Sequence, residues 1–159
     1  TDSAVGVVRR CADDRRIGTI VLKREHRGSS IHIDIRDGSG GLTDGKHGFH
    51  LHRCGDERNS DRKCTSMCEH YNRRGQPNQH GGLFTQIRHS GDLGNIESQN
   101  GIIKTMIRLN NNQLRIEECI GRSFIVHAGE DDLGKGGNEA SKITGNSGAR
   151  YAYAIVGML

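Results

Sequence analysis

Two histidines separated by one residue, His50 and His52, are the part of this chain best suited to chemistry. They alternate with two apolar residues, Phe49 and Leu51. Side chains of a β-strand point alternately to its two faces, so a strand here would place both imidazoles on one face. Two imidazoles on one face could form half of a metal site. The alternative is a half-buried strand that carries two exposed histidines.

More residues of the same kind follow, in a long polar segment and at the ends of predicted strands: His70, His80, His89, Asp92 and His127. Each one alone could be an ordinary surface or core residue. Six imidazoles in segments that can converge favour a shared role. Imidazole binds copper and zinc well, and a set of histidines with one aspartate suits zinc.

Short alternating strands must position these residues. The clearest lies at 31–36, where three isoleucines alternate with polar residues. The same pattern predicts strands at 5–8, 17–22, 42–52, 93–97, 102–109, 113–117, 123–127 and 151–159. Two polar segments, 53–91 and 128–148, interrupt them, and loops of that length are usually functional. Without helical periodicity, the pattern predicts an all-β sandwich or barrel.

The composition predicts one domain, residues 1–159. Apolar residues make up 32% and glycines number 23, which suits short strands and tight turns. The net charge of +4 is scattered and aromatic residues are few, so we expect no nucleic-acid partner. No run of 18 apolar residues occurs, so we expect no membrane span. We expect a cytoplasmic location, although a removed leader would leave secretion open.

The whole chain resembles the copper,zinc superoxide dismutase family. The resemblance is carried by separate motifs along the chain: Gly48-Phe49-His50-Leu51-His52, Cys64-Thr65-Ser66 with His70, His80-Gly81-Gly82, 89–95, Gly121-Arg122 with Val126-His127, 131–139 and 145–150. It implies an eight-stranded Greek-key β-barrel with a long metal-binding loop and a second, electrostatic-type loop. The implied activity is dismutation of superoxide to dioxygen and hydrogen peroxide, by alternate reduction and oxidation of a histidine-ligated copper.

The resemblance also implies a role for each candidate residue. The implied copper ligands are His50, His52, His70 and His127, and the implied zinc ligands are His70, His80, His89 and Asp92. His70 would then bridge both metals and donate a proton in the second half-reaction. Asp131 would bond His50 and His80 and so tie the two sites together. His47 would be structural, and His26 and His32 would lie on the surface.

Arg150 matches the family's arginine beside the copper, which implies that it docks the anionic substrate. Lys135, Glu139 and Lys142 match or replace residues of the family's steering loop. That loop departs from the family pattern, because Ala140 stands at a usually acidic position and Ile143 at a usual lysine position. We therefore expect dismutation with altered steering.

The cysteines depart further from the family. The family joins the loop cysteine, here Cys64, to a cysteine of the last strand, but Tyr153 stands at that place. Cys64 is then free or has another partner such as Cys54 or Cys68, and packing of Tyr153 against the base of the loop could compensate. Whether Cys11 and Cys119 pair stays open. Cys54 and Cys119 fall where family dimers touch, as packed thiols or as an intersubunit bond.

The resemblance finally implies partners and rival functions. Superoxide would be the substrate, a second copy of the chain would form a homodimer, and a copper chaperone could supply the copper. One alternative is a copper-chaperone-type domain, and another is a metal-binding relative without turnover. The presence of both His127 and Arg150 favours the enzyme.

Overall fold

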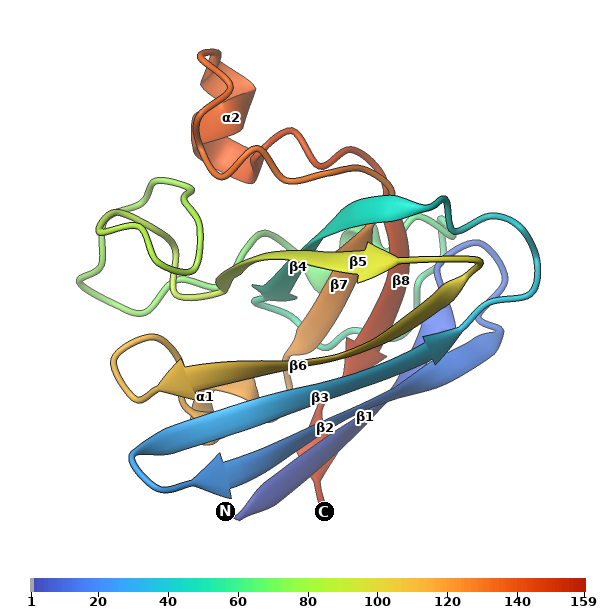
Figure 1. Cartoon of the computed structure of the whole chain (residues 1–159), viewed down its shortest axis with the longest axis horizontal. Coiled ribbons are helices and arrows are strands. Elements are labelled where there is room, and N and C mark those ends of the chain that lie inside the picture. Colours follow the sequence, from blue (N-terminus) through green and yellow to red (C-terminus); the bar gives the residue numbers. More distant parts are fainter. Residues whose placement is uncertain (1) are drawn as a thin grey trace.

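The computed structural model describes residues 2–159. Within this range one antiparallel sheet contains all nine strands, and two short helices and a 3₁₀ turn lie outside it (Figure 1). The strands are β1 (Ser3–Arg10), β2 (Arg16–Glu25), β3 (Gly28–Arg36), β4 (Gly45–His52), β5 (Asp92–Ser98), β6 (Ile102–Asn110), β7 (Ser123–His127), β8 (Arg150–Ile155) and β9 (Gly157–Met158). The helices are α1 (Ile116–Cys119) and α2 (Glu139–Thr144), and the 3₁₀ turn is Thr65–Met67.

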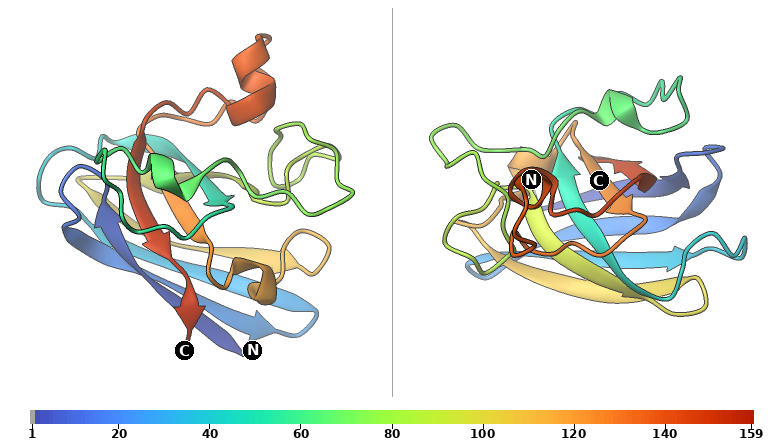
Figure 2. Two further views of the ribbon diagram at one scale, coloured as in Figure 1. Left: turned by 180° about the vertical axis from the view of Figure 1, so that it is seen from behind. Right: turned by 90° about the horizontal axis from the view of Figure 1, so that it is seen from above.

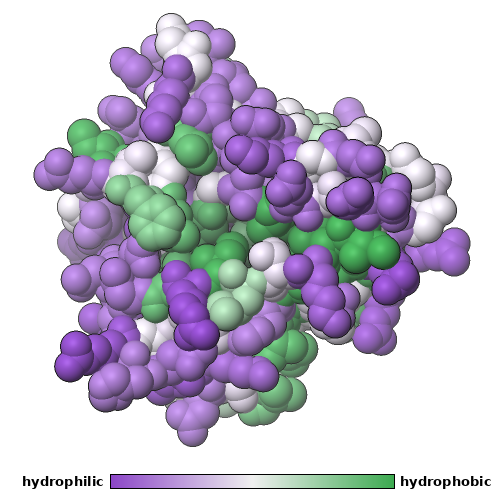
Figure 3. All heavy atoms as spheres, in the orientation of Figure 1, coloured by the Kyte–Doolittle hydropathy of each residue, from purple (hydrophilic) through white to green (hydrophobic). Residues whose placement is uncertain are grey.

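The order β5-β4-β7-β8-β1-β2-β3-β6 brings the two edge strands, β5 and β6, together as a hairpin. Only the bridge Gln99↔Ile102 joins that hairpin in the described chain, so the barrel is nearly closed. Figure 3 shows a band of apolar atoms across this face, within an otherwise hydrophilic surface. The predicted eight-stranded all-β barrel is confirmed, and the short β9 adds a further pairing to β1.

Alternation of apolar residues fills the barrel interior. Ile31, Ile33 and Ile35 of β3 are each at most 1% exposed, as the pattern at 31–36 predicts. Phe49 of β4 stacks on Phe124 of β7 with ring centroids 5.1 Å apart. Because Phe49 faces the core, the neighbouring histidines of β4 face the other side of the sheet.

One predicted strand, 113–117, is wrong. Residues before Ile116 form a turn, and α1 begins there. The Glu118 carboxylate accepts a 2.8 Å hydrogen bond from the Arg115 N–H, which caps the first turn of a helix. Burial alternates at Leu114 and Ile116, which explains the strand prediction, but within the helix Ile116 and Cys119 are buried three residues apart. The local capping bond favours the helix over a strand.

The two long loops lie on the same side of the barrel (Figure 2). The His80 N–H donates a 2.7 Å hydrogen bond to the Lys142 carbonyl, which joins the first loop to α2. The Asn138 side chain caps α2 through the Ser141 N–H, and Gly145 ends the helix with φ 77°. The second loop therefore contains a short helix that the alternation pattern does not indicate.

Two disulfides hold the first loop, Cys11–Cys64 and Cys54–Cys68. Of the alternatives left open, Cys64 is not free but has another partner, and that partner is Cys11, just after β1, rather than Cys54 or Cys68. β1 lies beside β8, and Arg9 pairs with Tyr153 across that ladder. The first loop is therefore tied to the end of β1, the strand beside β8. Within the described chain Cys119 is the free cysteine, and it is buried.

Tyr153 packs where the family's second cysteine would stand. It is 5% exposed and clusters with Cys11, Cys64 and Met67. Its hydroxyl donates a 2.8 Å hydrogen bond to Asp14 Oδ1. The expectation that this tyrosine packs against the base of the loop is confirmed.

Candidate metal centre

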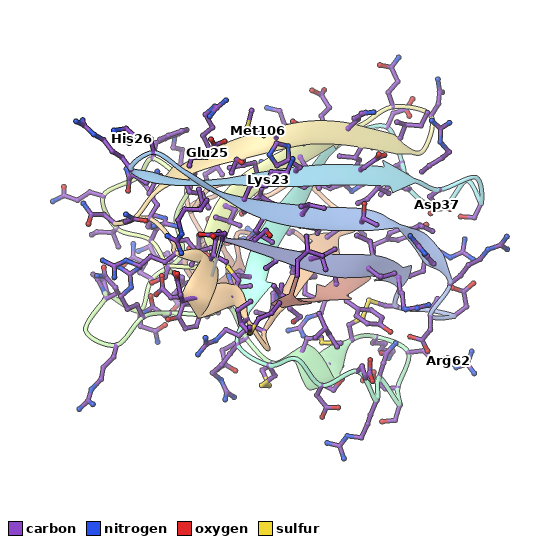
Figure 4. The ribbon with its side chains drawn as sticks, turned by 90° about the horizontal axis from the view of Figure 1, so that it is seen from below. Lys23, Glu25, His26, Asp37, Arg62 and Met106 are labelled. Carbon is purple, nitrogen blue, oxygen red and sulfur yellow. A yellow bond between two sulfur atoms is a disulfide. The ribbon has the colours of Figure 1, made fainter. Side chains whose placement is uncertain are left out.

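Seven side chains gather between the barrel wall and the two loops. They come from β4, β5, β7 and the first loop, and all are between 0% and 7% exposed: His50, His52, His70, His80, His89, Asp92 and His127. They form two sets of four ligand atoms, each set within 4.8 Å, and His70 belongs to both. The structure thus brings together all seven residues that the sequence singled out. His26 lies at the exposed turn between β2 and β3 (Figure 4).

The first set contains four imidazoles: His50, His52, His70 and His127. The His50 ring centroid lies 4.1 Å from that of His70 and 4.8 Å from that of His127. In each of the three rings that belong to this set alone, one nitrogen is hydrogen-bonded to a residue outside the set. The Nδ1 atoms of His52 and His127 hydrogen-bond the carbonyls of Cys68 at 2.8 Å and Gly148 at 3.0 Å.

The other nitrogen of each of these rings is buried and has no hydrogen-bond partner among residues 2–159. These atoms are His50 Nδ1, His52 Nε2 and His127 Nε2. Burying polar atoms without partners is costly, and three of them facing one point is the arrangement that a bound metal satisfies. An all-histidine set suits copper. The residues present therefore fit a copper ion.

The second set surrounds Asp92. The Nδ1 atoms of His70, His80 and His89 lie 3.0, 3.1 and 3.3 Å from its carboxylate. A tetrahedral zinc with bonds of about 2.0–2.1 Å has edges between ligand atoms of roughly 3.3 Å. The other Asp92 oxygen, Oδ2, accepts from the N–H groups of Gly81 and His89 at 2.9 and 2.8 Å. These two bonds fix the Asp92 carboxylate among the three histidines. The residues present therefore fit a zinc ion.

His70 lies between the two sets. Its Nδ1 faces Asp92, so its Nε2 faces the other histidines of the first set. The backbone of His70 forms a β-bridge with His52, which carries this loop residue to the end of β4. One imidazole can therefore present one nitrogen to each metal.

Asp131 joins the two sets from the second loop. Its Oδ2 is 2.7 Å from His50 Nε2, and its Oδ1 is 2.8 Å from His80 Nε2. These three residues could be taken for a third metal site. The distances are those of direct hydrogen bonds, so the imidazoles donate to the carboxylate and no ion is needed between them. Asn95 of β5 holds Asp131 through two backbone hydrogen bonds, of 2.7 and 2.9 Å.

Burial sets the protonation of the histidines in the first set. Desolvation lowers the pKa of His50, His52 and His70, and it lowers the pKa of His127 to about 4. These rings are therefore neutral at pH 7, as metal ligands must be. Burial also opposes a proton on His80, but its contacts with Asp131 and Asp92 outweigh burial and raise its pKa to about 9, so a metal bound at its Nδ1 would displace a proton.

His47 supports the site without facing it. Its Nδ1 is 2.8 Å from the His127 carbonyl and its Nε2 is 2.7 Å from the Thr43 carbonyl. Both nitrogens are engaged with backbone oxygens, which leaves neither for a metal. The ring ties the end of β7 to the segment before β4.

Arg150 lies, half-buried, in the wall of a cavity at the site. Its guanidinium Nη1 donates a 2.8 Å hydrogen bond to the Cys64 carbonyl. The residue lines a cavity of about 390 Å³ with His52, His70 and His127. The cavity also contacts Thr144 and Asn146 but none of Lys135, Glu139 and Lys142, which are exposed on the second loop.

The carboxylate of Asp37, just after β3, holds Tyr151, the neighbour of Arg150. Asp37 accepts hydrogen bonds from the Tyr151 hydroxyl and the Ser39 N–H, the latter at 2.9 Å, and forms an ion pair of 3.3 Å with Arg10. Burial opposes its ionisation, but these partners together hold its pKa below the usual range. Asp37 is therefore ionised at neutral pH.

Sequence reasoning did not find several contributors. Asn78 contacts His89 Nε2 at 3.0 Å, and Asn95 carries Asp131. The carbonyls of Cys68 and Gly148 orient two histidines of the first set, His52 and His127. No periodicity or spacing marks such residues, because each acts across a loop whose path is irregular.

The family model described as copper/zinc superoxide dismutase (SODC) matches residues 16–156. A protein of Neurospora crassa named superoxide dismutase [Cu-Zn] is 42% identical, and the match covers 98% of this chain and 97% of that protein. One of Schizosaccharomyces pombe with the same name is 40% identical with the same coverage.

A mouse protein named copper chaperone for superoxide dismutase is 46% identical over 73% of this chain, and the match covers 40% of that protein. The two full-length matches therefore extend over more of this chain than the chaperone match does. In residues 2–159 there is no helix with the length and apolar character needed to cross a membrane.

Proposed function

The chain belongs to the copper/zinc superoxide dismutase family, and from that premise we propose how its own residues serve the family's reaction. It binds copper and zinc and converts two superoxide anions and two protons into dioxygen and hydrogen peroxide. Bound copper supplies the one-electron oxidation and reduction. The observation that carries the assignment of residues is the single imidazole, His70, common to two complete ligand sets.

We propose that His50, His52, His70 and His127 hold copper and that His70, His80, His89 and Asp92 hold zinc. The buried nitrogens of the first set and the spacing around Asp92 support this division. His70 would carry a proton on Nε2, the nitrogen that faces the reaction pocket, and deliver it to the reduced substrate. Its Nδ1, which faces Asp92, keeps the ring in place while that proton moves.

We propose that Arg150 docks superoxide. The guanidinium is half-buried and shares the 390 Å³ cavity with three of the copper histidines. A fixed cation there attracts a small anion and orients it toward those rings. Arg150→Ala should therefore lower kcat/KM, while copper and zinc content stay unchanged.

We propose that Lys135, Glu139 and Lys142 shape the field outside this cavity. All three are exposed on the second loop, so they act over distance rather than by contact. Raising ionic strength should lower kcat/KM in the wild type, and less so when Lys135 and Lys142 are both replaced by serine. Lys104→Ser, on β6, is the control. A kcat/KM independent of ionic strength would exclude steering by this loop.

The experiment for the assigned centre combines metal content by mass spectrometry with superoxide consumption. Wild-type protein should contain both metals and consume superoxide. His127→Ala should retain zinc and lose activity, whereas His26→Ala, at the exposed β2–β3 turn, should retain both metals and activity. Full copper and zinc without superoxide consumption would contradict the proposal.

We propose a homodimer, with copper delivered by a chaperone in the cytoplasm. A groove of about 360 Å³ is lined by half-buried apolar side chains of β1 and β8, including Val5, Val7 and Ile155. A second copy could cover these side chains. Light scattering should give twice the monomer mass, and Ile155→Asp should give the monomer. Cell fractionation tests the compartment.

A second candidate function follows from the partial match to the mouse chaperone. In that case the chain would bind a partner enzyme rather than turn over superoxide. The complete copper set and Arg150 support the enzyme instead. The metal and activity measurement above separates the two candidates.

A further inference from the structure

Asn59 is a buried residue in an exposed stretch of the first loop. Its side chain is 3% exposed, although its neighbours Arg58 and Ser60 are exposed. Three residues further on, Arg62 extends into solvent (Figure 4). Asn59 also adopts a left-handed backbone conformation, φ 44°, which asparagine tolerates better than most residues. Specific contacts must therefore hold the Asn59 side chain inward.

The side-chain amide of Asn59 bridges the two cysteines of the Cys11–Cys64 disulfide. Its Nδ2 donates to the Cys11 carbonyl and to Asp14 Oδ1, both at 2.9 Å. Its Oδ1 accepts from the Cys64 N–H at 2.8 Å. One side chain thus fixes the backbone of both half-cystines.

The Cys64 peptide is the link to the reaction pocket. Its N–H is held by Asn59, and its carbonyl accepts from Arg150 Nη1 at 2.8 Å. Cys64 is fully buried and adopts φ 59°. A displacement of this residue therefore displaces the oxygen that orients the guanidinium.

A further hydrogen bond, from Tyr153, anchors the same network to β8. The Tyr153 hydroxyl donates to the Asp14 oxygen that also accepts from Asn59. The hydrogen bonds from Asn59 and Tyr153 hold the pKa of Asp14 below its usual range, so the carboxylate is ionised when it accepts them. Loop, β1 and β8 are therefore joined without using the covalent bond.

We propose that Asn59 is a positioning residue for Arg150, and that it holds the Cys64 carbonyl in place independently of the Cys11–Cys64 disulfide. The inference rests on the proposed role of Arg150 in docking the anion. Its consequence is that breaking the disulfide alone leaves the guanidinium near its position, whereas removing the amide of Asn59 releases it.

The test measures azide affinity by absorption titration of the copper- and zinc-loaded protein. It also measures hydrogen exchange of the Cys64 amide by NMR on the zinc-loaded, copper-free protein. The variants are Asn59→Ala, Cys11→Ala, both together, and Arg150→Ala. Asn100→Ala is the matched control, because Asn100 has φ 53° on an exposed turn and so bears a similar backbone cost.

Asn59→Ala should weaken azide binding about tenfold and speed exchange of the Cys64 amide, since small misplacements of a docking group are costly. Cys11→Ala should weaken azide binding less than about threefold, and the double variant should approach Arg150→Ala. Asn100→Ala should change neither readout.

Three outcomes would overturn the inference. Asn59→Ala could lower the melting temperature and leave azide affinity unchanged, which is a structural role only. Cys11→Ala could be as damaging as Asn59→Ala, which makes the covalent bond the anchor. Arg150→Ala could bind azide as tightly as wild type, which removes the docking role and this inference together, whereas the first two outcomes leave the docking role standing.

Discussion

Asp131 offers the sharpest test of how the second loop supports the metals. It is 1% exposed, and each of its carboxylate oxygens accepts from a different histidine, one in the copper set and one in the zinc set. Asp131→Ala would leave the Nε2–H groups of His50 and His80 buried without an acceptor. Each ring would then lose the contact that fixes its orientation toward its metal.

The geometry sets the size of the effect. Removing a carboxylate that orients a ligating histidine typically lowers metal affinity by about 10–100-fold, which is roughly 1.4–2.7 kcal/mol. Because one hydrogen bond serves each metal, at 2.7 Å and 2.8 Å, we expect a loss of this size for copper and for zinc separately. A variant that affected one metal alone would indicate that only one of the two bonds matters.

Competition with a chelator, titrated into the metal-free protein with each metal in turn, measures both affinities. Asp132→Ala is the matched control, since Asp132 lies next in the chain and bonds Ser141 and Asn146 rather than a histidine. Affinities within twofold of wild type in a folded Asp131→Ala protein would refute the reasoning. An equal loss in the Asp132 variant would refute it as well, because the loop rather than the carboxylate would then be responsible.

Three further predictions concern the same framework. Gly145→Ala should weaken zinc binding at least tenfold by the chelator assay, because a Cβ there, at φ 77°, would overlap Asp131 and His80. At pH 7, Asp37→Asn should lower the melting temperature. Below about pH 4, the melting temperature of the variant should fall less steeply with decreasing pH than that of the wild type. The folded pKa of Asp37 lies below the unfolded value of about 3.9, so its ionised form stabilises above that pH and the contribution is lost as the pH falls through the folded pKa. Cys54→Ala should lower the free energy of unfolding in denaturant by about 3 kcal/mol, since the bond to Cys68 spans 14 residues; a loss below about 1 kcal/mol would mean that hydrogen bonds already order the loop.

Local chemistry explains which parts of the fold could be predicted. The barrel follows from alternation, since Ile31, Ile33 and Ile35 must all reach one core, and the same period places His50 and His52 together on β4. The short helix α1 was missed because four residues are too few to show helical periodicity and because burial alternates at Leu114 and Ile116, as in a strand. Short helical segments therefore need the structure, whereas long alternating strands such as β3 do not.

The metal centre divides in the same way. The residue types could be assigned from the chain and its resemblance, but the orienting partners could not. Cys11 is 53 residues from Cys64, and Asn59 is 48 residues from the Cys11 carbonyl that it binds. Contacts of that range are decided by how an irregular loop packs on β1, and no period in the sequence records it.

The placement of the disulfides bears on the order in which the chain can mature. All four paired cysteines lie between residues 11 and 68, whereas a bond to position 153 would need β8 to be in place. Neither bond needs a residue of β5 to β8, so both cross-links can close, and shape the first part of the first loop, before the strands that complete the site have paired.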